Sequence, residues 1–142
     1  MISYVSHSPA ETEQFAAGLA SKLKGGDVLA FRGGLGAGKT AFVRGLARGL
    51  GSDSDVSSPT FSLVHEYQSD PPLYHFDLYR IHTFDDLYST GFFDYLDAGG
   101  ILAVEWSENI PEALPPETIT VSIVPQGDEI RMITVEGGCQ NF

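Results

Sequence analysis

Residues 33–40 match the pattern G-x-x-x-x-G-K-[ST], which is typical of loops that bind phosphate groups. Glycines let successive backbone N–H groups turn inward around a phosphate, and the helix that follows directs its N-terminus at the same anion. In this pattern the Lys39 ammonium reaches the β- and γ-phosphates, and the Thr40 hydroxyl can ligate Mg²⁺. The candidate nucleotide-binding residues of the loop are Gly33, Gly34, Leu35, Gly36, Ala37, Gly38, Lys39 and Thr40.

Two carboxylates could serve the same site. Four apolar residues, 101–104, precede Glu105, as in the buried strand that carries the Mg²⁺-organising acid of phosphate-loop enzymes. Asp77 stands among apolar residues of another alternating segment and competes for that role. The hydrophobic spacing favours Glu105 at the metal, directly or through water, and leaves Asp77 as a second acid. Candidate catalytic residues are thus Lys39, Asp77 and Glu105, and candidate metal ligands are Thr40 and Glu105.

Three further side chains are candidates for contact with the nucleotide. Thr12 falls in the first turn of a helix expected to begin at Pro9, where it could border a base or simply occupy the helix surface. Thr60 follows the polar segment 52–59, which is either a solvated connection or a mobile segment that senses Mg²⁺ or the γ-phosphate. Trp106, next to Glu105, either lies in the core or is partly exposed beside the ligand.

A phosphate loop needs a strand before it and a helix after it, and both are expected here. Residues 28–31 form a short apolar run typical of a buried parallel strand. Residues 40–50 place apolar side chains at four-residue spacing on one face of a helix, and Gly51 follows where a glycine commonly ends one. Strand, loop and helix therefore stand in the required order.

The rest of the pattern predicts an α/β fold of one domain, with a mixed sheet flanked by helices in the manner of phosphate-loop NTPases. Alternating segments at 61–67 and 73–79 predict a hairpin or two neighbouring strands, and 118–124 with 129–135 predict a second hairpin. Other expected elements are an edge strand at 2–5, a helix from Pro9 that ends before Gly25, a short helix at 84–88, a buried strand at 101–104 and a frayed tail at 136–142.

The composition narrows the class of protein. The chain has 142 residues, 42% of them hydrophobic, which suits one domain with a sizeable core. Its formal net charge of −11 predicts repulsion from a nucleic-acid backbone unless a partner supplies positive surface. Cys139 is the single cysteine, so neither an intrachain disulfide nor a cysteine metal cluster is expected. The sequence shows no signal-peptide pattern and no apolar run that could span a bilayer, so we expect a cytoplasmic protein with no membrane contact.

The choice among phosphate-loop proteins depends on what the chain lacks. No asparagine begins the N-K-x-D guanine reader of a GTPase, so ATP or ADP is expected. A small-molecule kinase needs lid arginines to neutralise the transferring phosphoryl group. Beyond residue 80 the only basic residue is Arg131, and the earlier arginines are Arg32, Arg44, Arg48 and Arg80. A stand-alone metabolite kinase therefore has thin support and stays the alternative.

Four stretches together resemble the TsaE family, the ATPases of bacterial tRNA threonylcarbamoyladenosine biosynthesis. In the family's order and spacing they are Gly36-Ala-Gly-Lys-Thr40, Ser58-Pro-Thr-Phe61, His75-Phe-Asp-Leu-Tyr-Arg80 and Val104-Glu-Trp-Ser-Glu108. The resemblance covers the chain from about residue 8 to residue 108. Gly34 replaces a usual aspartate and Ala41 a common second threonine, and neither change removes a phosphate or metal group.

The resemblance implies an α/β phosphate-loop fold and a weak ATPase activity that uses ATP and Mg²⁺. It also implies a complex with TsaB-type and TsaD-type proteins, which transfer the threonylcarbamoyl group to adenosine 37 of certain tRNAs, so that tRNA is met only through the complex. By the matching motifs, Lys39 binds phosphate, and Thr40 and Glu105 hold Mg²⁺. Asp77 supports catalysis, and Thr60 lies in a switch-like loop.

Overall fold

The computed structural model describes residues 1–33, 38–52, 64–138 and 142. The strands in this part of the chain are β1 (Ile2–Ser6), β2 (Val28–Arg32), β3 (Val64–Tyr67), β4 (Leu73–Asp77), β5 (Ile101–Glu105), β6 (Ile119–Pro125) and β7 (Arg131–Gly137). The helices are α1 (Pro9–Ala20), α2 (Lys39–Gly49), α3 (Phe84–Ser89) and α4 (Phe92–Leu96), with the short 3-10 turns η1 (Ser107–Asn109) and η2 (Pro111–Ala113). The predicted helices at 40–50 and 84–88 are thereby confirmed.

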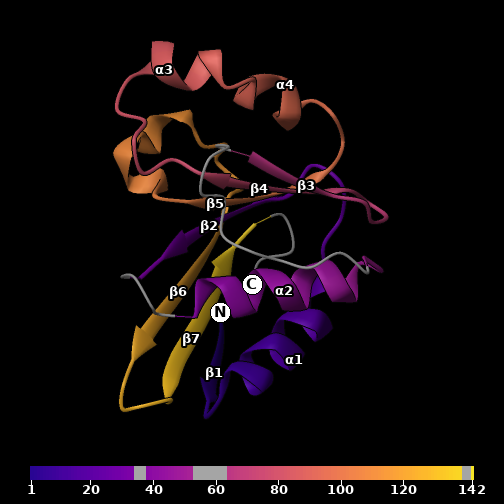
Figure 1. Ribbon diagram of the computed structural model, residues 1–142, viewed down its shortest axis with the longest axis vertical. Coiled ribbons are helices and arrows are strands. Elements are labelled where there is room, and N and C mark those ends of the chain that lie inside the picture. Colours follow the sequence, from indigo (N-terminus) through magenta and orange to yellow (C-terminus); the bar gives the residue numbers. More distant parts are fainter. Residues whose placement is uncertain (34–37, 53–63, 139–141) are drawn as a thin grey trace.

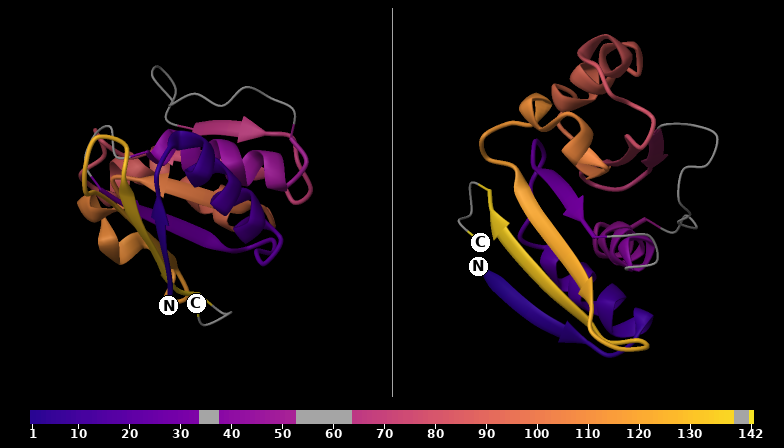
Figure 2. Two further views of the ribbon diagram at one scale, coloured as in Figure 1. Left: turned by 90° about the horizontal axis from the view of Figure 1, so that it is seen from below. Right: turned by 90° about the vertical axis from the view of Figure 1, so that its left-hand side faces the viewer.

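The strands form one mixed sheet in the order β1-β7-β6-β2-β5-β4-β3 (Figure 1). β2 runs parallel to β5 on one side and to β6 on the other, and β4 runs parallel to β5. β3 pairs antiparallel with β4, as β7 does with both β6 and β1. The mixed α/β sheet, the two hairpins and the N-terminal edge strand are confirmed. The sequence pattern did not indicate that the second hairpin joins the sheet directly beside β2, as Figure 2 shows.

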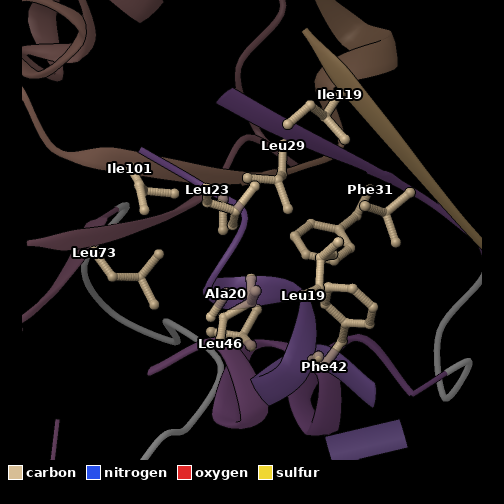
Figure 3. Packing of buried hydrophobic residues seen from close by; sticks show 14 of the residues in the cluster. Leu19, Ala20, Leu23, Leu29, Phe31, Phe42, Leu46, Leu73, Ile101 and Ile119 are labelled. Carbon is tan, nitrogen blue, oxygen red and sulfur yellow. The ribbon is translucent and has the colours of Figure 1, made fainter. Parts of the chain in front are cut away.

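Helices cover both faces of the central strands. One face packs on α1 and α2 through Leu19, Leu29, Phe31, Phe42, Leu46, Leu73 and Ile101 (Figure 3). The other packs on α3 and α4 through Val28, Phe76, Leu87, Phe92, Leu102 and Val104. Side chains alternate along a strand, so positions 73, 75 and 77 of β4 share a face with 101, 103 and 105 of β5. The polar side chains that end both strands therefore lie on the α2 side of the sheet.

α1 and α2 approach closely because α2 presents glycines to α1. A Cβ atom at Gly45 would overlap the Glu13 carbonyl oxygen and the Ala16 side chain, and Gly49 is similarly close to the α1 backbone. Neighbouring backbone cannot give way as a flexible side chain can. This contact therefore fixes α2, whose first residue is Lys39, between α1 and the sheet.

Gly45→Ala should lower the thermal unfolding midpoint by a few degrees. Alanine favours a helix over glycine by about 1 kcal/mol, but overpacking against the α1 backbone costs about 1–3 kcal/mol, and we expect the upper end because a carbonyl oxygen is displaced. Gly18→Ala is the matched control, because nothing lies within 4 Å of a Cβ atom at that exposed position of α1. It should raise the midpoint. Calorimetric melting of both variants checks the expectation, and equal shifts would contradict it.

The C-terminal strand extends further than the expected fraying at 136–142. Glu136 and Gly137 belong to β7, so the expectation is wrong for them. It is also wrong for Phe142, whose backbone N–H donates to the Gly137 carbonyl at 3.0 Å and whose ring packs on the core. The physical reason is that Glu136 and Gly137 pair with Thr120 and Ile119 of β6, and this pairing outweighs the usual fraying of a chain end.

Candidate functional site

The candidate site forms where the carboxyl ends of β2, β4 and β5 meet the first turn of α2. β2 ends at Arg32 and α2 begins at Lys39, which confirms the order strand, loop, helix. Gly33 and Gly38 have φ angles of 142° and 102°, which L side chains rarely adopt. Both positions therefore require glycine, as the pattern predicts. The intervening Gly34, Leu35, Gly36 and Ala37 lie outside the described residues.

Lys39 is buried, and its ammonium lies over the ring of Trp106. The distance from Nζ to the ring centroid is 5.1 Å, within the range of cation–π attraction. Trp106 has a φ of 62°, which is uncommon outside glycine, and its ring packs edge-on against Tyr79. Trp106 is partly buried and also packs against the core cluster on the α3–α4 face, so its contact with a ligand stays a prediction. Thr40, in the same turn as Lys39, is also partly buried.

Asp77 and Glu105 are register partners at the ends of β4 and β5. Glu105 is buried and Asp77 is half-buried. Burial raises the pKa of Asp77 above its ordinary value, and the neighbouring Glu105 carboxylate raises it further. The Tyr79 N–H, which donates to Asp77 Oδ1 at 3.0 Å, and the Lys39 charge lower the Asp77 pKa without cancelling the shift. The structure thus brings together Lys39, Asp77 and Glu105, the three candidate catalytic residues.

His75 is a member of this cluster that the sequence analysis missed. Its Nε2 atom lies 2.6 Å from Oε2 of Glu105, and the ring is fully buried. Strand alternation could have indicated His75, because it precedes Asp77 by two residues and side chains two apart lie on the same face of a strand. No histidine–histidine or histidine–cysteine spacing marks it, since its partner lies on a different strand.

Thr12 lies in the wall of a cavity of about 210 Å³ beside the first turn of α2. The cavity is lined by Ser8, Pro9, Thr12, Gly38, Ala41, Asp128, Glu129 and Arg131. Thr12 is buried, and its Oγ1 lies 2.7 Å from Oγ of Ser6. The interpretation of Thr12 as a helix-surface residue is therefore wrong. Residues near 128–131, distant in sequence, share the same cavity.

Two of the arginines that a kinase lid would require are engaged elsewhere. Arg44 and Arg48 of α2 both form ion pairs with Glu13 of α1, the first with Nη1 at 3.7 Å from Oε2. Their charges help to join the two helices. Arg32 and Arg80 are exposed. Thr60, the candidate of the switch-like segment, lies outside the described residues.

Magnesium fits the donors that the site offers. Thr40 and Glu105 supply a hydroxyl and a carboxylate oxygen, and Mg²⁺ is usually held by one or two protein oxygens with substrate phosphates and water. Across the described ranges, no cluster of three or more histidine, cysteine, aspartate or glutamate side chains could hold a metal ion without such help. Burial is the main cause of the raised pKa of Asp77, and repulsion by Glu105 adds to it; a divalent cation would offset that repulsion.

No described helix is both long enough and apolar enough to pass through a membrane.

Comparison with known proteins gives consistent matches along the chain. Residues 6–133 match the sequence model of the family described as "Threonylcarbamoyl adenosine biosynthesis protein TsaE". The "tRNA threonylcarbamoyladenosine biosynthesis protein TsaE" of Bacillus subtilis (strain 168) is 43% identical over 128 residues, which cover 89% of this chain and 80% of that protein. The protein of the same description from Treponema pallidum (strain Nichols) is 37% identical over 131 residues, 92% of this chain and 97% of the relative. A crystal structure of Bacillus subtilis YdiB superposes with a TM-score of 0.79 at 36% identity, covering 99% of this chain and 88% of that one.

Proposed function

The chain belongs to the TsaE family of threonylcarbamoyl adenosine biosynthesis proteins, and from this premise we propose that it is a Mg²⁺-dependent ATP-binding protein with weak ATPase activity. We propose that it supports a complex of TsaB-type and TsaD-type partners that forms N6-threonylcarbamoyladenosine in tRNA.

One observation carries the proposal. The buried lysine that follows the glycine loop, Lys39, has its ammonium over the ring of Trp106, the residue after Glu105, and Glu105 is the register partner of Asp77. A phosphate-binding cation and two carboxylates on neighbouring parallel strands are the parts that phosphoryl chemistry requires at one place. A glycine-rich turn with an incidental lysine would not bring these three groups together.

Each residue then has a distinct role. Lys39 binds the phosphates, and the ring of Trp106 lies beside its ammonium. Thr40 and Glu105 would hold Mg²⁺, which when bound neutralises charge on the phosphate oxygens. Asp77 orients a water molecule for attack and accepts its proton. A raised pKa suits this last role, because a general base works best when its pKa approaches the working pH.

The cavity beside α2 is the proposed site of the base. Gly38 and Ala41 line part of it, so a nucleotide whose phosphates lie on the first turn of α2 has this cavity next to it. Thr12 borders the cavity and would contact the base or ribose. This arrangement supports a nucleotide as the ligand, and the lack of an N-K-x-D guanine reader favours ATP or ADP.

The charge of the chain supports an indirect relation to tRNA. A net charge of −11 disfavours direct contact with a nucleic-acid backbone, so we assign tRNA binding to the partner proteins and place the complex in the cytoplasm. A stand-alone metabolite kinase is the weaker alternative, because Arg44 and Arg48 are occupied by Glu13. Partner-stimulated release of ADP without a phosphorylated metabolite separates the two.

Titration calorimetry with ATP and GTP, each with Mg²⁺, tests the nucleotide assignment. ATP should bind more tightly, and Lys39→Ala should weaken its binding about tenfold or more, because charge-assisted hydrogen bonds contribute about 1.5–3 kcal/mol each. Lys24→Ala is the matched control, since Lys24 is exposed in the turn between α1 and β2. Tighter binding of GTP, or equal effects of the two lysine substitutions, would contradict the assignment.

A further inference from the structure

The pair formed by His75 and Glu105 is the most buried polar contact of the candidate site. His75 lies in the middle of β4, directly opposite Ala103 of β5, and reaches Glu105 diagonally. The imidazole is fully buried, and the Nε2–Oε2 distance is 2.6 Å. A contact this short and this well shielded holds the Glu105 side chain in one orientation.

The surroundings of the ring identify the donor. Nδ1 of His75 is buried and has no hydrogen-bond partner among the residues that the structure describes. A proton on Nδ1 would therefore be a buried donor without an acceptor, which is costly. We assign a proton to Nε2, so that His75 donates to Glu105 Oε2.

We propose that His75 is a positioning residue that orients the metal-binding carboxylate of Glu105. With Oε2 occupied by the imidazole N–H, Oε1 remains for the metal ion or for its water. Partners of this kind fix the orientation of a ligating side chain, and their loss typically costs about 10–100-fold in metal affinity. The inference rests on the proposed role of Glu105 and adds a residue to it.

A purely structural role would have a different signature. If His75 only filled the core, its replacement would weaken every binding property together with stability. If His75 orients Glu105, its replacement should weaken only the part of nucleotide binding that depends on Mg²⁺. ADP is the suitable probe, because it can be titrated with Mg²⁺ and again with EDTA, without turnover.

His75→Gln and His75→Asn form a matched pair of amide variants for this test. The glutamine amide N–H can reach the position of Nε2, whereas the shorter asparagine amide cannot. His75→Asn should lose about 10–100-fold of the Mg²⁺-dependent gain in ADP affinity and keep the wild-type affinity in EDTA. His75→Gln should restore most of the gain. Equal losses with and without Mg²⁺, or an unchanged gain in His75→Asn, would overturn the inference.

Glu105→Gln in the same titrations separates this inference from the proposed function. If Glu105→Gln loses the Mg²⁺-dependent gain but His75→Asn keeps it, Glu105 is the metal ligand and only the role of His75 fails. If Glu105→Gln keeps the full gain, the proposed metal role fails, and the role of His75 fails with it. Because each variant is compared with itself in EDTA, a general loss of stability does not imitate the expected result.

Discussion

Addition of a TsaB–TsaD-type pair should accelerate ATP hydrolysis by this protein by as much as about 10³–10⁵-fold, the range of an arginine finger supplied in trans. In the proposed site Lys39 meets the phosphates, whereas Arg44 and Arg48 form ion pairs with Glu13. Arg32 and Arg80 are exposed and hold no place in the proposed site, so we expect a partner to supply the positive group at the γ-phosphate. Steady-state hydrolysis by the chain alone, and then with the pair, measures the effect.

Thr60→Ala tests whether the segment before β3 takes part in that stimulation. We expect the substitution to leave the slow basal rate unchanged and to reduce the stimulated rate, because Thr60 is proposed to respond to Mg²⁺ and phosphate when the partner pair is bound. Fast hydrolysis by the isolated wild-type chain, unaffected by the pair, would rule out the partner-driven assignment. An autonomous ATPase or a metabolite kinase would then be the better description.

Asp77→Asn should reduce kcat by about 10²–10⁴-fold, the usual contribution of a general base. ATP affinity should change little, because an asparagine oxygen can still accept the Tyr79 N–H and Glu105 is untouched. Single-turnover hydrolysis and ADP titration measure the two quantities separately. Asp94→Asn is the matched control, since Asp94 is exposed on α4. Equal loss of affinity and rate would show that Asp77 is instead a metal ligand.

Asp77→Asn should also make the folded protein more stable at neutral pH. The pKa of Asp77 is raised in the folded state, so the folded state binds this proton more tightly than the unfolded state does. Between the ordinary pKa of about 3.9 and the raised value, stability therefore falls as the pH rises, and the deficit persists at pH 7. Asp77→Asn removes this deficit. The gain in melting temperature should disappear in acid, where the aspartate is protonated in both states.

The sequence was sufficient to predict the local elements but not all of their neighbours. The glycine pattern and the apolar run at 28–31 predict β2, its loop and α2 because each signal is local. The position of β6 beside β2 is not local, since alternation specifies which side chains face the core and not which strand lies adjacent. The close contact at Gly45 was missed for a similar reason: the glycine looks like a weak helix position until α1 is placed against it.

In the candidate site, too, some contacts could be predicted from the sequence and others could not. Asp77 and Glu105 could be expected to meet, because the carboxyl ends of parallel strands lie at one edge of a sheet. The hydrogen bond from His75 to Glu105 could not be expected, because these two residues are not opposite each other on β4 and β5. Thr12 is buried against Ser6 of β1, and it shares a cavity wall with Asp128, Glu129 and Arg131, which are more than a hundred positions away in the sequence. No periodicity in α1 reveals either neighbour.

The place of β2 in the sheet has a consequence for biosynthesis. β2 carries the phosphate loop near the start of the chain, yet both of its neighbours, β5 and β6, are made much later. While the ribosome is still translating, residues 28–32 have two unpaired edges, and closing the long loops to their partners is slow. The nucleotide site is thus completed only when synthesis is nearly finished. A nascent chain arrested before Ile119 would expose an apolar strand that chaperones and proteases can recognise.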